Sequence, residues 1–234
     1  MLDTLRELKL DSNTLVIFSS DNGPWLVKGA DAGTAGPLRG GKGSTWEGGM
    51  REPTIAWWPG RIAAGTVCDA VAGNIDFLPT FVTLAGGTVP ADRKIDGRDF
   101  SPLLLGQSRV SAREAHYYYR GYKLEAVRVG PWKLALGPQN ESMGKAGKNP
   151  AADTVESGPR LYNLDAEIGE RTNVAAQHPD VVQRLQALAA DMAADIGDGQ
   201  PGPGVRPAGY VENPQLLFAG TDAAKPKRAK KNAK

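Results

Sequence analysis

The spacing of apolar residues in the first half of the chain predicts helices that alternate with strands. Leucines at helical spacing predict a helix over residues 1–10. Residues 14–19 are apolar on both faces, which is typical of a strand in a parallel sheet covered by helices. A second buried strand is predicted at residues 54–58 and a helix at residues 74–84. Residues 1–110 are therefore predicted to form part of an α/β domain with a mostly parallel sheet.

The hydrophobic pattern changes after residue 110. Short apolar runs separated by turn residues are typical of an antiparallel sheet, and they occur at residues 116–119, 122–129, 132–136 and 160–164. Apolar side chains along one face of residues 180–196 predict a helix that packs on this sheet. Residues 111–196 are thus expected to form a small antiparallel sheet with a helix. The polar segment 137–158 is predicted to be a mobile excursion, and residues 197–234 a Pro/Gly-rich linker with a disordered basic tail.

Two hard oxygen donors follow the first predicted strand. Asp21 offers a carboxylate and Asn22 an amide oxygen, and Gly23 comes directly after them. Such oxygens suit Ca²⁺ or Mg²⁺ better than softer metals. Their position just past a strand is also where open α/β sheets place ligands. The same three residues are favourable turn residues, so a purely structural turn is the alternative interpretation.

A lysine stands in the middle of a glycine-rich segment. Lys42 lies between Gly41 and Gly43, within residues 23–51, which lack apolar periodicity and are predicted to form a long loop. Loops of this length in compact domains are usually functional or disordered. The flanking glycines let the backbone approach a ligand while the ammonium group reaches an oxyanion; a solvated lysine is the alternative. Three charged residues are predicted to pair with one another and hold the loop in shape: Arg39, Glu47 and Arg51.

Histidines and cysteines are few. His116 is expected to be a packed, hydrogen-bonded imidazole, with the lining of a pocket as the alternative. His178 is expected at the surface or at the start of the C-terminal helix. Cys68 is the only cysteine, so no disulfide forms within the chain, and a partly buried, inert thiol is predicted.

The charge of the chain is concentrated at its end. The net charge is +2, yet the last ten residues contribute +6 and residues 1–224 carry −4. A solvated tail is a better interpretation of this cluster than weak nucleic-acid binding, and no nucleic-acid partner is expected. The sequence has no apolar stretch long enough for a membrane span, and no signal peptide is recognised at its start.

Several motifs, in order and spacing, resemble the type I sulfatases, the formylglycine-dependent arylsulfatase family of the alkaline-phosphatase-like superfamily. The resemblance covers roughly residues 1–190 and matches the C-terminal portion of such an enzyme. Its most specific segments are Ser20-Asp-Asn-Gly-Pro24, Gly41-Lys-Gly-Ser-Thr-Trp-Glu-Gly-Gly-Met-Arg-Glu-Pro53, Asp76-Phe-Leu-Pro-Thr80, Ala126-Val-Arg-Val-Gly-Pro-Trp-Lys133 and Leu161-Tyr-Asn-Leu164.

The resemblance implies a function for the candidate residues. It implies that Asp21 and Asn22 ligate Ca²⁺ or Mg²⁺, that Lys42 contacts sulfate, and that the substrate is a small sulfate ester or a sulfated glycan. The family's nucleophile is a formylglycine made from a Cys/Ser-x-Pro-x-Arg motif, which this sequence lacks. We therefore expect a fragment of a sulfuric ester hydrolase that is inactive in isolation. The parent enzyme is expected to be exported or periplasmic, although the sequence leaves its location open.

Two alternatives stay open at this point. A phosphoester or phosphonate hydrolase of the same superfamily would use a similar metal pair and lysine. A non-catalytic binding module would use the remaining pocket without turnover. The length of the matching segments favours the sulfatase.

Overall fold

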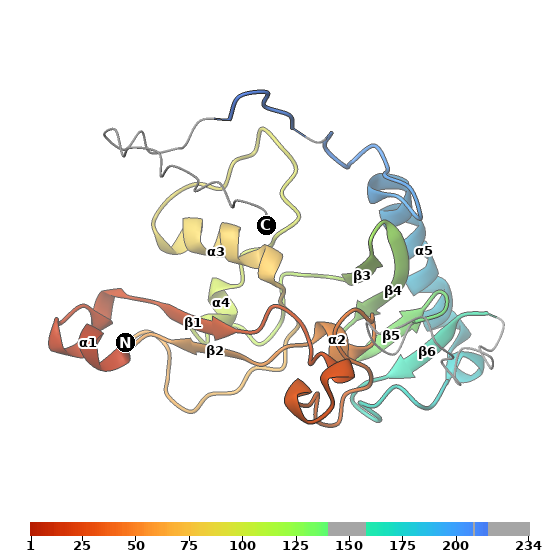
Figure 1. Cartoon of the computed structure of the whole chain (residues 1–234), viewed down its shortest axis with the longest axis horizontal. Helices are drawn as coiled ribbons and strands as arrows, with labels where there is room; N and C mark the ends of the chain where they lie inside the picture. The colour runs from red at the N-terminus through yellow and green to blue at the C-terminus, as the bar shows by residue number, and fades with distance from the viewer. Residues whose placement is uncertain (140–157, 208, 215–234) are drawn as a thin grey trace, which may run out of the picture.

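Two separate β-sheets organise the part of the chain that the structure describes, one formed by residues of the first 60 and one by residues 116–163 (Figure 1). The structure is a computed structural model that describes residues 1–139, 158–207 and 209–214. Most of the excursion predicted at residues 137–158, and most of the predicted basic tail, lie outside the described residues. No helix in the described ranges is long and apolar enough to span a membrane.

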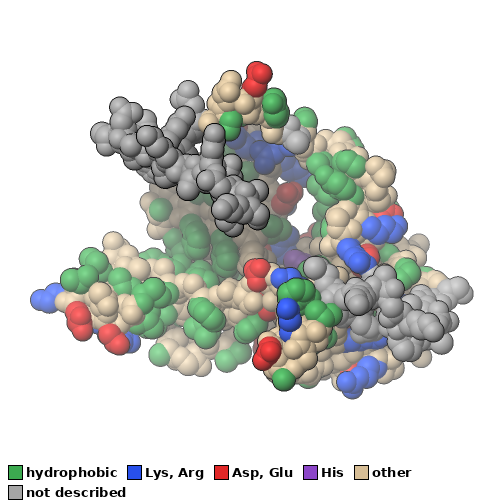
Figure 2. Space-filling view, viewed as in Figure 1, with side chains coloured by type: hydrophobic (Ala, Val, Ile, Leu, Met, Phe, Trp, Pro, Cys, Tyr) green, Lys and Arg blue, Asp and Glu red, His purple; other side chains and the backbone are tan. Residues whose placement is uncertain are grey.

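The first sheet has two strands and follows a short helix, α1 (Leu2–Glu7). Strand β1 (Val16–Ser19) pairs antiparallel with β2 (Thr54–Trp57), with Phe18 opposite Ile55. These two side chains are 69% and 63% exposed, respectively. Hydrophobic side chains also gather over this part of the molecule in the space-filling view (Figure 2). The sheet therefore presents an apolar face to solvent.

This arrangement corrects two details of the predicted first sheet. The strand at residues 54–58 was expected to be buried, and the sheet mostly parallel, whereas the described pair is antiparallel and partly exposed. A parallel pair needs a crossover, usually a helix, that returns the chain to the starting end of the first strand. Residues 20–53 instead form an irregular loop with only short helical turns, which lets the second strand run back along the first.

The segments around this sheet contain short helices. The helix predicted at residues 74–84 is confirmed as a 3₁₀ turn followed by α3, with buried Asp76 at their junction. An oxygen of Asp76 accepts the backbone N–H of Gly73 at 2.7 Å, and the other accepts that of Arg98 at 2.6 Å. Arg113 pairs with the same carboxylate, which ties the helix to the second half of the chain. The short elements are η1 (Asp11–Asn13), η2 (Leu26–Ala32), α2 (Glu47–Met50), η3 (Asn74–Asp76), α3 (Phe77–Leu84) and α4 (Ser101–Leu104).

The second sheet confirms the predicted small antiparallel sheet with a C-terminal helix. Its four antiparallel strands follow chain order: β3 (His116–Arg120), β4 (Lys123–Val129), β5 (Trp132–Ala135) and β6 (Arg160–Asn163). After η5 (Ala175–Gln177), helix α5 (Pro179–Ile196) packs along this sheet (Figure 1). Fully buried apolar side chains from both elements form the main core, among them Val127, Leu134, Leu161 and Leu185.

Part of the predicted linker after α5 is held against the second sheet. The backbone N–H of Gly199 donates to the carbonyl of Tyr122 at 2.7 Å. Asp198 forms an exposed ion pair with Lys123 at 2.9 Å. These contacts give the start of the linker a defined path.

Candidate functional site

Backbone hydrogen bonds join the two predicted pieces of the site. The N–H of Gly23 donates to the carbonyl of Gly49 at 3.2 Å, and the N–H of Lys42 donates to the carbonyl of Pro24 at 2.9 Å. The approach is so close that a Cβ atom at Gly23 would lie 1.9 Å from the carbonyl oxygen of Gly48. Only glycine fits there. The turn that carries Asp21 and the loop that carries Lys42 therefore lie against each other.

The oxygen donors lie at the end of β1, as the sequence predicts. Asp21 is exposed and Asn22 is half-buried. The hydroxyl of Ser20 donates to the carbonyl of Asn22 at 2.9 Å, which stabilises the turn. The carboxylate and the amide side chain are thus presented on a hydrogen-bonded turn next to the glycine-rich loop.

A third oxygen donor, Glu52, was missed by the sequence analysis. Its Oε1 atom is shielded from solvent and has no hydrogen-bond partner in the described part of the chain. Burial and the nearby charge of Asp21 raise the pKa of Glu52, while a hydrogen bond with Ser20 opposes them. The two carboxylates are therefore close enough to interact. The Arg51-Glu-Pro53 motif held this residue, but nothing in its spacing assigned it a role.

These donors fit part of a site for a hard divalent cation. Asp21, Asn22 and Glu52 offer carboxylate and amide oxygens, the donor type that Ca²⁺ and Mg²⁺ prefer. The buried, unpartnered oxygen of Glu52 is the kind of atom that a cation would satisfy. Ca²⁺ takes about six to eight oxygens, and no group of three His, Cys, Asp or Glu side chains is arranged to hold a metal ion within the described residues. Such a cation would need further donors from water or other residues.

Lys42 is half-buried and lies beside an aromatic ring. Its Nζ atom is 5.7 Å from the ring centroid of Trp25, and the Nζ of Lys28 is 4.7 Å from the same centroid. Both distances are within the range of cation–π attraction. Two ammonium groups thus lie close to the same ring.

A buried ion pair, different from the predicted one, holds the loop behind Lys42. Glu47 was expected to pair with Arg39 or Arg51; it contacts Arg128 at 2.6 Å and Lys133 at 3.1 Å instead. Burial raises the pKa of Glu47, but the two cations and a hydrogen bond from Tyr118 lower it more, to about 2. Local spacing favoured the nearby arginines, whereas the fold brings in charges about 80 residues away.

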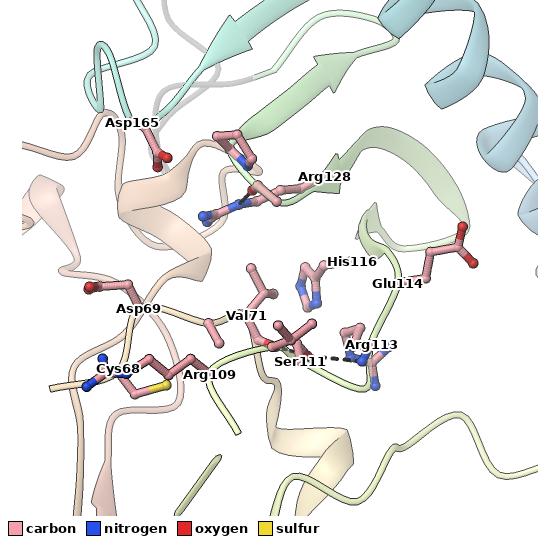
Figure 3. Close-up of a pocket in the computed structure, with 14 residues that line it drawn as sticks. Cys68, Asp69, Val71, Arg109, Ser111, Arg113, Glu114, His116, Arg128 and Asp165 are labelled. Atoms are coloured by element: carbon pink, nitrogen blue, oxygen red, sulfur yellow. Dashed lines mark hydrogen bonds between the residues drawn. The ribbon is translucent and has the colours of Figure 1, made fainter. Parts of the chain in front are cut away.

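A cavity of about 580 Å³ opens where the two halves of the chain meet, lined by residues that include Cys68, Arg109, Arg113, His116, Arg128 and Asp165 (Figure 3). His116 packs edge-on against Tyr118, but its Nδ1 atom has no hydrogen-bond partner in the described part of the chain. The ring is packed as expected and it also lines a pocket, which was the alternative, while its Nδ1 atom makes no hydrogen bond within the described residues. Burial and the charge of Arg113 lower the pKa of His116 to about 4, so the ring is neutral near pH 7.

Two further residues for which predictions were made from the sequence are Cys68 and His178. Cys68 is exposed, which corrects the partly buried thiol that was predicted. The ring of His178 lies 4.6 Å from that of Trp132, and this histidine precedes α5 as expected. Neither residue adjoins the turn of Asp21 in any contact found among the described residues.

Comparison with known proteins decides the family. The sulfatase family model matches residues 1–87, and the model for the C-terminal region of aryl-sulfatase matches residues 111–204. This chain belongs to the sulfatase family. It is 39% identical over 227 residues to human arylsulfatase A, covering 89% of this chain and 44% of that protein. It is 35% identical over 219 residues to dog N-acetylgalactosamine-6-sulfatase, covering 86% of this chain and 42% of that protein. The sulfatase chain thus spans less than half the length of these relatives.

Solved structures support the same fold. The PsFucS1 sulfatase from Pseudoalteromonas sp. superposes with a TM-score of 0.73 at 29% identity, covering 82% of this chain and 39% of that one. BT4656, solved in complex with its substrate D-glucosamine-2-N,6-O-disulfate, gives a TM-score of 0.57 at 25% identity. The match covers 86% of this chain and 38% of that one. The predicted α/β, alkaline-phosphatase-like class is confirmed, and the phosphoester alternative is not favoured. The roles of Asp21, Asn22 and Lys42 stay predictions, as does the domain division.

Proposed function

We propose that this sulfatase chain forms the part of a sulfuric ester hydrolase that holds the divalent cation and the sulfate group. Asp21 and Asn22 would ligate the cation, with Ca²⁺ as the first choice, and Lys42 would contact the sulfate. The observation that supports this most is the pair of backbone hydrogen bonds that hold the Asp21 turn against the Lys42 loop. They hold the backbone segments that carry Asp21, Asn22 and Lys42 against each other.

The chemistry of these residues suits an anionic ester. A bound divalent cation would supply charge that polarises the sulfate oxygens. Lys42 would donate hydrogen bonds to an oxygen that gains negative charge in the transition state, and losing one such donor costs about 10²–10³ in rate. Trp25, whose ring lies near the ammonium group of Lys42, would limit the orientations of that group.

The substrate class that we propose is a sulfate ester, with a sulfated sugar as the more specific choice. Among the related proteins, one is an N-acetylgalactosamine-6-sulfatase and another was solved with a disulfated glucosamine. The pair of ammonium groups near Trp25 is compatible with a substrate that carries more than one negative charge.

Binding experiments on the 234-residue chain test this proposal. Titration calorimetry is expected to show that Asp21→Ala weakens Ca²⁺ binding and that Lys42→Ala weakens inorganic sulfate binding. The loss of sulfate affinity should be roughly tenfold or more, because a hydrogen bond to a charged group contributes about 1.5–3 kcal/mol. The loss of Ca²⁺ affinity is expected because the variant lacks one anionic ligand. Lys123→Ala, which removes an exposed lysine of the second sheet, is the matched control. Unchanged affinities in the first two variants would show that Asp21 is only a turn residue and that Lys42 is only a solvated surface residue.

The chain itself is expected to hydrolyse no aryl sulfate above background. Its sequence contains no Cys/Ser-x-Pro-x-Arg segment from which the family's formylglycine could form. The assay would follow the release of the chromogenic phenol from an aryl sulfate, with Ca²⁺ at a saturating concentration. Steady turnover that disappears in Lys42→Ala would contradict this expectation and point to another nucleophile.

A further inference from the structure

Four buried charged side chains meet at residues 45–47, shortly after Lys42 in the same loop. Lys133 of β5 is fully buried, and its Nζ atom is 3.1 Å from Glu47 Oε1 and 2.7 Å from Glu170 Oε1. Arg128 of β4 pairs with the other oxygen of Glu47. Two cations thus face two carboxylates with almost no access to water. We call Glu47, Arg128, Lys133 and Glu170 the buried charge cluster.

The same residues also satisfy the backbone of the loop. Lys133 Nζ donates to the carbonyl of Thr45 at 2.8 Å, and Glu170 Oε2 accepts the N–H of Glu47 at 2.7 Å. The hydroxyl of Thr45 donates to Glu125 Oε2 of β4 at 2.7 Å. These contacts and the ion pairs of Glu47 attach residues 45–47 to the second half of the chain.

This attachment fixes the backbone on both sides of Lys42. The N–H of Gly48 donates to the carbonyl of Arg39 at 2.7 Å, and that of Ser44 donates to the carbonyl of Gly41 at 3.0 Å. The glycine-rich segment that carries Lys42 is thus closed on itself, and its closing residues are adjacent to Glu47. Glycine-rich backbone has little stiffness of its own, so its conformation depends on such anchors.

Glu170 is held in an unfavourable conformation at this place. Its φ is 54°, in the left-handed region that residues other than glycine rarely adopt. Its carbonyl accepts a hydrogen bond from Arg39 Nη1 at 3.0 Å, so its backbone and its carboxylate both contact the loop. A strained residue persists only where its surroundings over-determine it.

We infer that Lys133 and Glu170 are positioning residues for the sulfate-binding lysine, acting through Glu47. The antiparallel sheet would then belong to the machinery of the sulfate site, because it supplies the charges that fix the loop. The inference rests on the proposed function of Lys42. An apolar contact would hold the loop less specifically, since charges that must each meet a partner allow fewer arrangements.

The test combines hydrogen exchange with sulfate titration on the full chain. Glu170→Gln keeps the shape of the side chain and removes its charge, and Lys133→Met removes the central cation. Both are expected to raise the exchange rates of the amides of residues 41–49 by roughly tenfold or more, while β4 and β5 keep their protection. Both should also weaken inorganic sulfate binding. Lys123→Met, which breaks the exposed pair with Asp198, is the matched control and should change neither measurement.

The outcomes separate this inference from the proposed function. Unchanged exchange of the loop amides in both variants would overturn the inference, whatever sulfate does. Loss of protection throughout the second sheet in both variants would also overturn it, because the cluster would then support the sheet rather than the loop. If the loop amides respond while Lys42→Ala binds sulfate normally, the cluster positions the loop but the assignment of sulfate to Lys42 fails.

Discussion

Acid should destabilise this chain through one buried carboxylate, Glu47. Its side chain is fully buried, and its pKa is about 2 in the fold against 4.5 for an unperturbed glutamate. Because the folded pKa is the lower one, the stabilisation is complete above pH 4.5 and is lost as the pH falls through 2. A shift of one unit corresponds to about 1.4 kcal/mol, so the loss is of order 3 kcal/mol.

Its neighbour Glu170 acts in the opposite direction. Burial raises the pKa of Glu170, and the charge of Glu47 adds to this rise. The charge of Lys133 and the hydrogen bond from the backbone N–H of Glu47 oppose the rise in pKa without reversing it. A raised pKa stabilises the fold at low pH, and this contribution is lost as the pH rises above 4.5. The two carboxylates therefore act in adjacent pH windows, which places the greatest contribution of the buried charge cluster near pH 4.5.

Urea unfolding at pH 5, 4, 3 and 2 measures the effect of Glu47. Glu47→Gln should be less stable than the parent at pH 5, yet it should lose about 3 kcal/mol less between pH 5 and 2. Tyr118→Phe is a milder companion, since it removes only the hydrogen bond to Glu47 at 2.7 Å. Carboxylates that do not interact with Glu47 cancel in the difference, whereas Glu170, which senses the charge of Glu47, does not cancel fully. Parallel stability curves for all three proteins would refute the reasoning, because Glu47 would then titrate as it does in the unfolded chain.

Two further predictions concern the metal site and the first sheet. Glu52→Gln should weaken Ca²⁺ binding roughly tenfold in calorimetric titrations, because hard-cation sites lose affinity with each anionic ligand removed; equal affinities would show that the unpartnered oxygen has no part in the site. We also expect the chain to self-associate through the exposed apolar face of its first sheet, and Phe18→Ser with Ile55→Thr should reduce this association in light scattering. Unaltered scattering would place the association surface elsewhere.

Local pattern alone predicted the second sheet and its helix. The segments that form β3 to β6 are short apolar runs separated by turn residues. Helix α5 repeats apolar residues at helical spacing, as in Leu185, Leu188 and Met192. Strand and helix periodicity depends on neighbours in sequence, so it needs no knowledge of the fold. The Asp21 turn and the Lys42 loop were found in the same way, from residue types and glycine spacing.

Tertiary structure decided what packs against what. The direction of β2 depended on the path of the loop before it, which periodicity does not describe. Lys133 follows Trp132 in a short strand and looks from its sequence like a solvent-facing residue, yet it is fully buried between two carboxylates. Its partners Glu47 and Glu170 lie far from it in sequence. Charges of opposite sign separated by dozens of residues leave no periodic signal, and only the folded chain shows that they neutralise one another.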